Sequence, residues 1–126
     1  MARLKRRLVV AGILSLSALG LSACGTGGAV DDAKASCVYV QKALALQKAS
    51  QAPGLSTSEQ SHLEAKALTE LLKGTPQAAQ ATSQDGSWNP LMTTINEAER
   101  VPLKYLAASL KNMCEVANSQ EPFLGD

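Results

Sequence analysis

Apolar residues recur at helical spacing through most of this sequence, and that periodicity restricts the chain to an all-helical fold. In the segment 31–52, for example, Ala33, Cys37, Val40 and Leu44 are spaced to share one face of a helix. No segment shows the alternation of Val, Ile and aromatic residues that strands favour. We therefore predict an all-α fold, a small helical bundle of about four helices.

Turn and capping residues predict where the first two helices end and begin. Pro53 and Gly54 end the first helix, because proline disfavours the helical conformation in the residue before it and glycine tolerates the turn. Ser56 and Glu59 have the spacing of a capping box, in which each side chain accepts a hydrogen bond from the other residue's free backbone amide. The second helix is predicted to run from there to Lys73.

Two dipeptides, Thr75-Pro76 and Asn89-Pro90, predict further helix starts, each with the polar residue as N-cap and proline in the first turn. The first would open a short helix to about residue 82. The second would open a helix that breaks near residue 100, because Pro102 interrupts the pattern.

A turn and a final helix complete the predicted domain. Asp85-Gly86 predicts a turn in which the glycine takes a positive φ. The last helix carries Leu103, Leu110 and Cys114 on one side and is predicted to end around residue 118.

The first 23 residues have the composition of an export signal rather than of a folded domain. An apolar run, Leu8 to Gly20, would span only about 20 Å as a helix, well short of a hydrocarbon core of about 30 Å. We therefore predict a signal peptide. The run follows an opening that is basic and has no acidic residue, with Arg3, Lys5, Arg6 and Arg7.

The apolar run ends in Leu21-Ser22-Ala23-Cys24, which resembles the lipobox of bacterial lipoproteins. The resemblance covers residues 1–24. It implies cleavage between Ala23 and Cys24, diacylglycerol on the Cys24 thiol and often a further acyl chain, such as palmitate, on the new amino group. Two or more chains anchor a protein stably, so the membrane is the expected partner, through lipid on Cys24.

The first residues are compatible with more than one export signal. An ordinary secretory signal with Cys24 near its cleavage site by chance is the alternative to the lipobox. Arg6-Arg7 faintly resembles a twin-arginine signal, although Sec export is the simpler expectation. Either route predicts an exported protein, which the lipid would hold to the outside of the cell membrane or to the cell envelope.

Cleavage would leave 103 residues, enough for one small domain. We divide the chain into a signal peptide at 1–23, a lipidated flexible tether at 24–30, a helical domain at 31–118 and a C-terminal tail at 119–126. The signal takes four basic residues with it, so the remainder has eight basic against eleven acidic residues. That mildly acidic balance argues against a nucleic-acid partner, because such binding comes largely from neutralised phosphates.

The two remaining cysteines, Cys37 and Cys114, are expected to form a disulfide between the first and last helices. Both lie on apolar helix faces, and export leads to a compartment where disulfides form. A redox pair or a metal site is the alternative. The sequence lacks the Cys-x-x-Cys spacing that is typical of such sites. A zinc site would also need two further ligands, and His62 is the sole histidine. We expect no metal and no cofactor.

Other candidate residues have simpler explanations than catalysis. His62 is expected on the surface, and Glu97 and Glu99 point to different faces of a helix, so no catalytic residue is predicted. Trp88, Tyr39 and Tyr105 are possible ligand or partner contacts. Aromatic residues such as these belong more often to a core.

The resulting hypothesis is a non-enzymatic lipoprotein of the cell envelope that binds a protein partner or supports the envelope. The alternative is a carrier or sensor of a small apolar ligand held between the helices. The mature segment, with Ala-rich helices, two cysteines and Asp85-Gly86-Ser87-Trp88 before a helix, loosely resembles small actinobacterial lipoproteins. This resemblance implies an envelope location and no particular activity.

Overall fold

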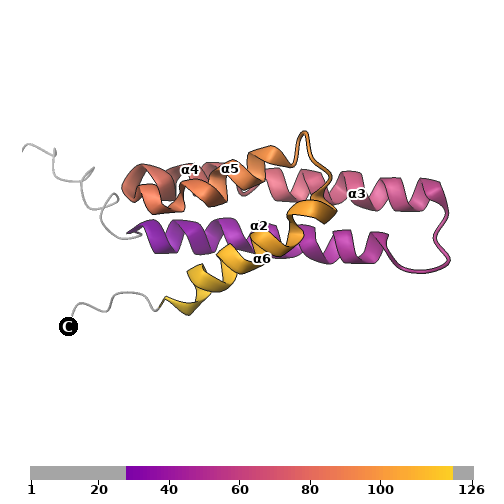
Figure 1. Cartoon of the computed structure of the whole chain (residues 1–126), viewed down its shortest axis with the longest axis horizontal. Helices are drawn as coiled ribbons and strands as arrows, with labels where there is room; N and C mark the ends of the chain where they lie inside the picture. The colour runs from indigo at the N-terminus through magenta and orange to yellow at the C-terminus, as the bar shows by residue number, and fades with distance from the viewer. Residues whose placement is uncertain (1–27, 121–126) are drawn as a thin grey trace, which may run out of the picture.

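The computed structural model describes residues 28–120, and every regular element in that range is helical. The elements are α2 (Gly28–Ser50), α3 (Thr57–Leu72), α4 (Thr75–Gln84), the 3₁₀ turn η1 (Gly86–Trp88), α5 (Asn89–Glu97) and α6 (Leu103–Ser119). Because α4 continues the line of α3 beyond a short break, the helices form four rods (Figure 1). The predicted all-α bundle is confirmed.

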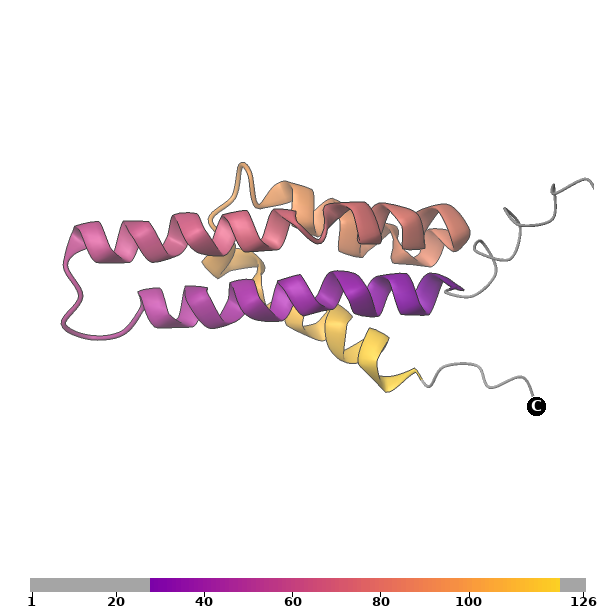
Figure 2. The ribbon, with the colours of Figure 1, turned by 180° about the vertical axis from the view of Figure 1, so that it is seen from behind.

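The helix α2 is the axis of the bundle. It packs along α3 and α4 on one side and against α6 on another, while α5 packs against α4 and α6. Figure 2 shows α6 crossing α2 obliquely and running in the opposite direction. These contacts bury seven residues of α2, among them Ser36, Cys37 and Val40.

Small residues make up much of the core. Where alanine faces alanine, helices approach closely and bury little apolar area per residue. Leu71, Leu91, Ile95 and Leu110 are the large side chains that are fully buried. Around them, the alanines with no exposed surface are Ala33, Ala43, Ala67, Ala78, Ala81 and Ala117.

Two elements approach closely at Ser36 of α2 and Gly74, which lies between α3 and α4. The Ser36 hydroxyl donates a buried hydrogen bond of 2.9 Å to the Gly74 carbonyl oxygen. A Cβ on Gly74 would lie 3.0 Å from both the carbonyl oxygen and the Oγ of Ser36. Gly74 has an ordinary φ of −80°, so glycine is needed here for space and not for backbone freedom.

The predicted capping box at the start of α3 is confirmed. The backbone N–H of Glu59 donates to Ser56 Oγ at 3.1 Å, and the N–H of Ser56 donates to Glu59 Oε2 at 2.9 Å. In the preceding turn Gly54 has a φ of +86°, a conformation that glycine adopts without steric cost. Local chemistry therefore fixes this turn as the sequence predicted.

The N-caps predicted at Thr75 and Asn89 are wrong. Both are the first residues of their helices, and the cap positions, Gly74 and Trp88, have helical backbone angles and no side-chain cap hydrogen bond. A side-chain cap needs a cap residue with extended backbone. Here the chain enters each helix directly from a preceding turn that is already helical, although Pro76 and Pro90 do lie in the first turns as predicted.

The loop predicted around Asp85-Gly86 is more regular than expected. The helix α4 continues to Gln84, and the positive φ predicted for Gly86 is wrong, because the positive-φ glycines of the described chain are Gly28 and Gly54. Asp85 makes the turn instead. Its backbone is extended, with a φ of −147°, and its side chain accepts from the Ser87 N–H at 2.9 Å.

The boundary of the predicted tether at 24–30 also changes. The helix α2 begins at Gly28 rather than at Asp31, and Ala29 and Val30 pack against the core. Burial of these two side chains extends the helix past the point where composition changes. Residues 24–27 lie outside the described part of the chain, as do the predicted signal peptide and residues 121–126.

Replacing Gly74 with alanine should destabilise the bundle by about 1–3 kcal/mol, because a backbone carbonyl cannot move away as a flexible side chain can. Gly86→Ala is the matched control, since a Cβ there would meet nothing within 4 Å. Urea unfolding measures both. Equal stability of the two variants would show that the contact at Ser36 is not tight.

Candidate functional site

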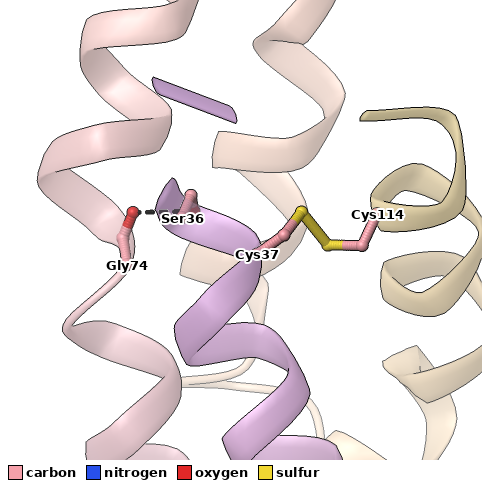
Figure 3. The surroundings of a disulfide bond; sticks show 4 residues. All are labelled: Ser36, Cys37, Gly74 and Cys114. Atoms are coloured by element: carbon pink, nitrogen blue, oxygen red, sulfur yellow. Dashed lines mark hydrogen bonds between the residues drawn. A yellow bond between two sulfur atoms is a disulfide. The ribbon is translucent and has the colours of Figure 1, made fainter. Parts of the chain in front are cut away.

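The predicted disulfide between Cys37 of α2 and Cys114 of α6 is present (Figure 3). The S–S distance is 2.08 Å and the two Cα atoms are 5.5 Å apart. Both residues are buried in the core. The bond therefore fixes how α6 sits on α2.

Neighbouring residues of α2 hold the bundle on two sides. Figure 3 shows Ser36 pointing toward Gly74 while Cys37 points toward Cys114. The hydrogen bond to Gly74 holds the junction of α3 and α4, and the disulfide holds α6. One turn of α2 thus joins three other helices.

The three aromatic residues predicted as possible ligand or partner contacts do not form one surface. Trp88 is buried, with 7% of its surface exposed, and belongs to the core. Tyr39 is partly buried, with the Lys42 ammonium 5.6 Å from its ring centre. Tyr105 is 67% exposed on the outer face of α6. These three side chains therefore do not line one common pocket between the helices.

The polar residues considered for catalysis lie on the surface. His62 and Glu99 are exposed. Glu97 forms an ion pair with Arg100 three residues along the chain. Within residues 28–120, no three His, Cys, Asp or Glu residues gather closely enough to hold a metal ion. The predicted modification and cleavage residues, Cys24 and Ala23, lie outside the described residues.

Two carboxyl groups have shifted pKa values, and local contacts account for both. A side-chain hydrogen bond from Lys73, 2.6 Å long, is the main reason that the pKa of Glu70 lies below its ordinary value. Hydrogen bonds from the backbone N–H and the hydroxyl of Ser87 lower the pKa of Asp85. Asp85 is exposed and Glu70 is partly buried beside its lysine, so neither shift indicates a fully buried acid or base.

One concave region is a cleft of about 430 Å³ between α2, α3 and the connection from α5 to α6. Glu64 and Lys104 line it together with Gln47 and Leu68. The buried Gln47 side chain is held by its own hydrogen bond, donating from Nε2 to Ser50 Oγ at 3.3 Å. The cleft is open to solvent and mixed in polarity.

A second concave region runs between α2 and α6, and we call it the α2–α6 groove. Two adjoining hollows of about 360 and 250 Å³ form it, and both are lined by Leu44, Lys48 and Lys111. Its larger hollow exposes mainly apolar surface. The disulfide residue Cys114 contributes to its wall, so the covalent bond that fixes α6 also fixes the shape of the groove.

Sequence reasoning missed the groove as a site. Leu44 was predicted only as part of a core face, and Lys104 and Lys111 were not singled out. The spacing of Lys104 and Lys111 could have indicated a shared face, because residues seven apart on a helix lie on the same side. That face lines a groove only because the disulfide holds α6 against α2.

Comparisons with known proteins gave no match. No family model, no curated protein and no solved structure matches this chain. In the part that the structure describes, no helix is long and apolar enough to cross a membrane.

Removing the disulfide with Cys37→Ser and Cys114→Ser should lower the free energy of unfolding by about 4 kcal/mol. The closed loop spans 77 positions, and the unfolded chain gains that freedom when the bond is absent. Urea unfolding with and without reductant measures the effect. The double variant should no longer respond to reductant, and a wild type that is equally stable when reduced would contradict the prediction.

Asp85 should make stability depend on pH. Its folded pKa is lowered, so its contribution is present above the unfolded value of about 4 and is lost as the pH falls through the folded value. We expect wild type to exceed Asp85→Asn in stability at pH 7 and the gap to close below pH ~4. Unfolding titrations from pH 7 to pH 2 check this. A difference in stability between the two proteins that stays constant from pH 7 to pH 2 would show that the Asp85 charge does not cause it.

Proposed function

We propose that this protein is an exported, lipid-anchored lipoprotein whose helical bundle binds a partner at the cell envelope and catalyses no reaction. Residues 1–23 serve as its signal peptide, and Cys24, after cleavage from Ala23, carries the lipid. The observation that carries the proposal is the sequence Leu21-Ser22-Ala23-Cys24 at the end of a short apolar run behind a basic opening.

The disulfide supports export. Thiols persist in the reducing cytosol, whereas structural disulfides form in the compartments beyond the membrane. Cys37 and Cys114 are bonded in the core of a bundle that is poor in large apolar residues, so the attachment of α6 depends on that bond. A chain built this way is suited to an oxidising environment.

The same disulfide leaves one cysteine for modification. The sequence contains three cysteines, and two of them are joined between α2 and α6. Cys24 is the third, and it occupies the position that the lipobox resemblance assigns to the acylated residue. The cysteine content therefore fits one structural bond and one lipid attachment.

The bundle has a geometry that suits attachment at this point. Gly28 follows Cys24 by four positions, a reach of at most about 14 Å. The start of α2 lies at the same end of the molecule as the last turn of α6 (Figure 1). With the lipid on Cys24, that end would face the membrane, and the turn after α2 would lie about 35 Å farther out.

A binding role is proposed over catalysis and over a ligand carrier. The shifted carboxyl groups, Glu70 and Asp85, are not fully buried and owe their pKa values to neighbouring side chains and turns. The carrier hypothesis needs a cavity between the helices, whereas the concave regions described above are open to solvent. What the bundle offers instead is open concave surface along α2 and α6.

Lipid attachment is tested by growing cells with a palmitate analogue and separating membranes from soluble material. Wild type should be labelled and remain with the membranes, whereas Cys24→Ser should lose the label and leave the membrane fraction, because stable anchoring needs the acyl chains. The double variant Cys37→Ser, Cys114→Ser should keep its label. Equal membrane association of Cys24→Ser and wild type would overturn the proposal.

A further inference from the structure

Much of the surface of the α2–α6 groove is apolar, and several of the side chains that line it are small. Ala107 and Ala108 of α6 and Ala45 of α2 line it beside the larger Leu44. Alanine allows another backbone to approach closely, as in packed helix pairs. The half-buried Leu44 packs against the core on one side and lines the groove on the other.

The rim of the groove is basic. Lys48 of α2 and Lys104 and Lys111 of α6 all line it, and Glu115 is the acidic residue among the lining side chains. Glu115 lies 4.0 Å from Lys111, and both side chains are largely exposed. An exposed pair at that distance contributes little. Over the described residues acidic groups slightly outnumber basic ones, so three lysines around one groove form a local positive field.

The shape of the groove favours a helix over a small molecule. Small ligands are normally enclosed, with about 70–90% of their surface buried, whereas this groove is open to solvent. From Lys104 to Asn118 it follows α6 over 15 residues, a length of about 21 Å or four helical turns. An amphipathic helix of similar length lies in such a groove with its apolar face down.

We propose that the α2–α6 groove binds an acidic amphipathic helix of a partner protein. The apolar stripe of that helix lies on Leu44, Ala107 and Ala108, and carboxylates at its edges face the three lysines. Lys104 and Lys111 are about 10.5 Å apart along α6, so acidic residues seven apart on the partner match them. The proposal rests on the binding role proposed above, but not on the lipid anchor.

A second copy of the chain suits the groove less well. A symmetric contact between two identical grooves would bring lysine rims of the same charge together. An acyl chain with an anionic head group and the acidic segment 121–126 of this chain share part of the required chemistry. The experiment below identifies each of these occupants by mass.

The test places benzoylphenylalanine, a photo-crosslinking residue, at Ala108 of the full chain in its host cells. Ala108 is exposed and lines the groove, whereas the neighbouring Ser109, also exposed, does not line it and serves as the control position. Irradiation should give a protein adduct from position 108 and little from 109. Mass spectrometry of the adduct should identify an acidic, amphipathic helical peptide.

Charge reversal then tests the rim. Lys104→Glu with Lys111→Glu should reduce the adduct about tenfold, because each lost ion pair costs up to about fivefold. Lys42→Glu with Lys66→Glu changes the net charge by the same amount at two exposed positions that do not line the groove, and should leave the yield unchanged. Reversing the two facing acidic residues in the identified partner should restore the adduct.

Several results would overturn the proposal. They are the absence of a protein adduct from position 108, an adduct with residues 121–126, with a second copy or with lipid, a basic partner peptide, and an equal loss from both lysine pairs. Comparing positions 108 and 109 keeps the test decisive if a charge-reversed variant fails to fold. Palmitate labelling of the same cells reports the anchor separately, so failure of the groove and failure of the anchor are distinguishable.

Discussion

The bundle depends on one turn of α2, where Ser36 and Cys37 bind in different directions. The serine hydroxyl holds the junction of α3 and α4 at Gly74, and the cysteine is bonded to Cys114 of α6. An alanine-rich core provides less hydrophobic stabilisation than one of larger side chains. The covalent attachment of α6 therefore adds to a modest hydrophobic stabilisation, and it also holds α6 in place as one wall of the groove between α2 and α6.

Much of the fold followed from local sequence chemistry. Helical periodicity, the Ser56–Glu59 capping box and the apolar positions of Cys37 and Cys114 predicted an all-helical bundle closed by a disulfide, and the structure has each feature. The errors fall where packing decides the backbone. Thr75 follows Gly74, which packs closely against Ser36 and has helical backbone angles. The helix therefore already includes Thr75, and Thr75 does not act as its N-cap.

The candidate site was less predictable, because it belongs to two helices that are far apart in the sequence. The aromatic residues were the obvious chemical candidates, yet Trp88 is in the core and Tyr105 faces outward. Lys48 and Lys111 are far apart in the sequence, and they line the same groove because the disulfide holds α6 against α2. Helical spacing identifies only the lining residues that lie on the same helix. Which residues of the other helix face them depends on the tertiary structure.

Amide hydrogen exchange on the full chain, oxidised and reduced, tests most directly whether the disulfide holds α6 in place. If it does, reduction should raise exchange in α6 at least about tenfold through local opening. The amides of α3, which is held by helix packing against α2, should change far less. Unchanged protection of α6 after reduction, or an equal loss in every helix, would contradict the account.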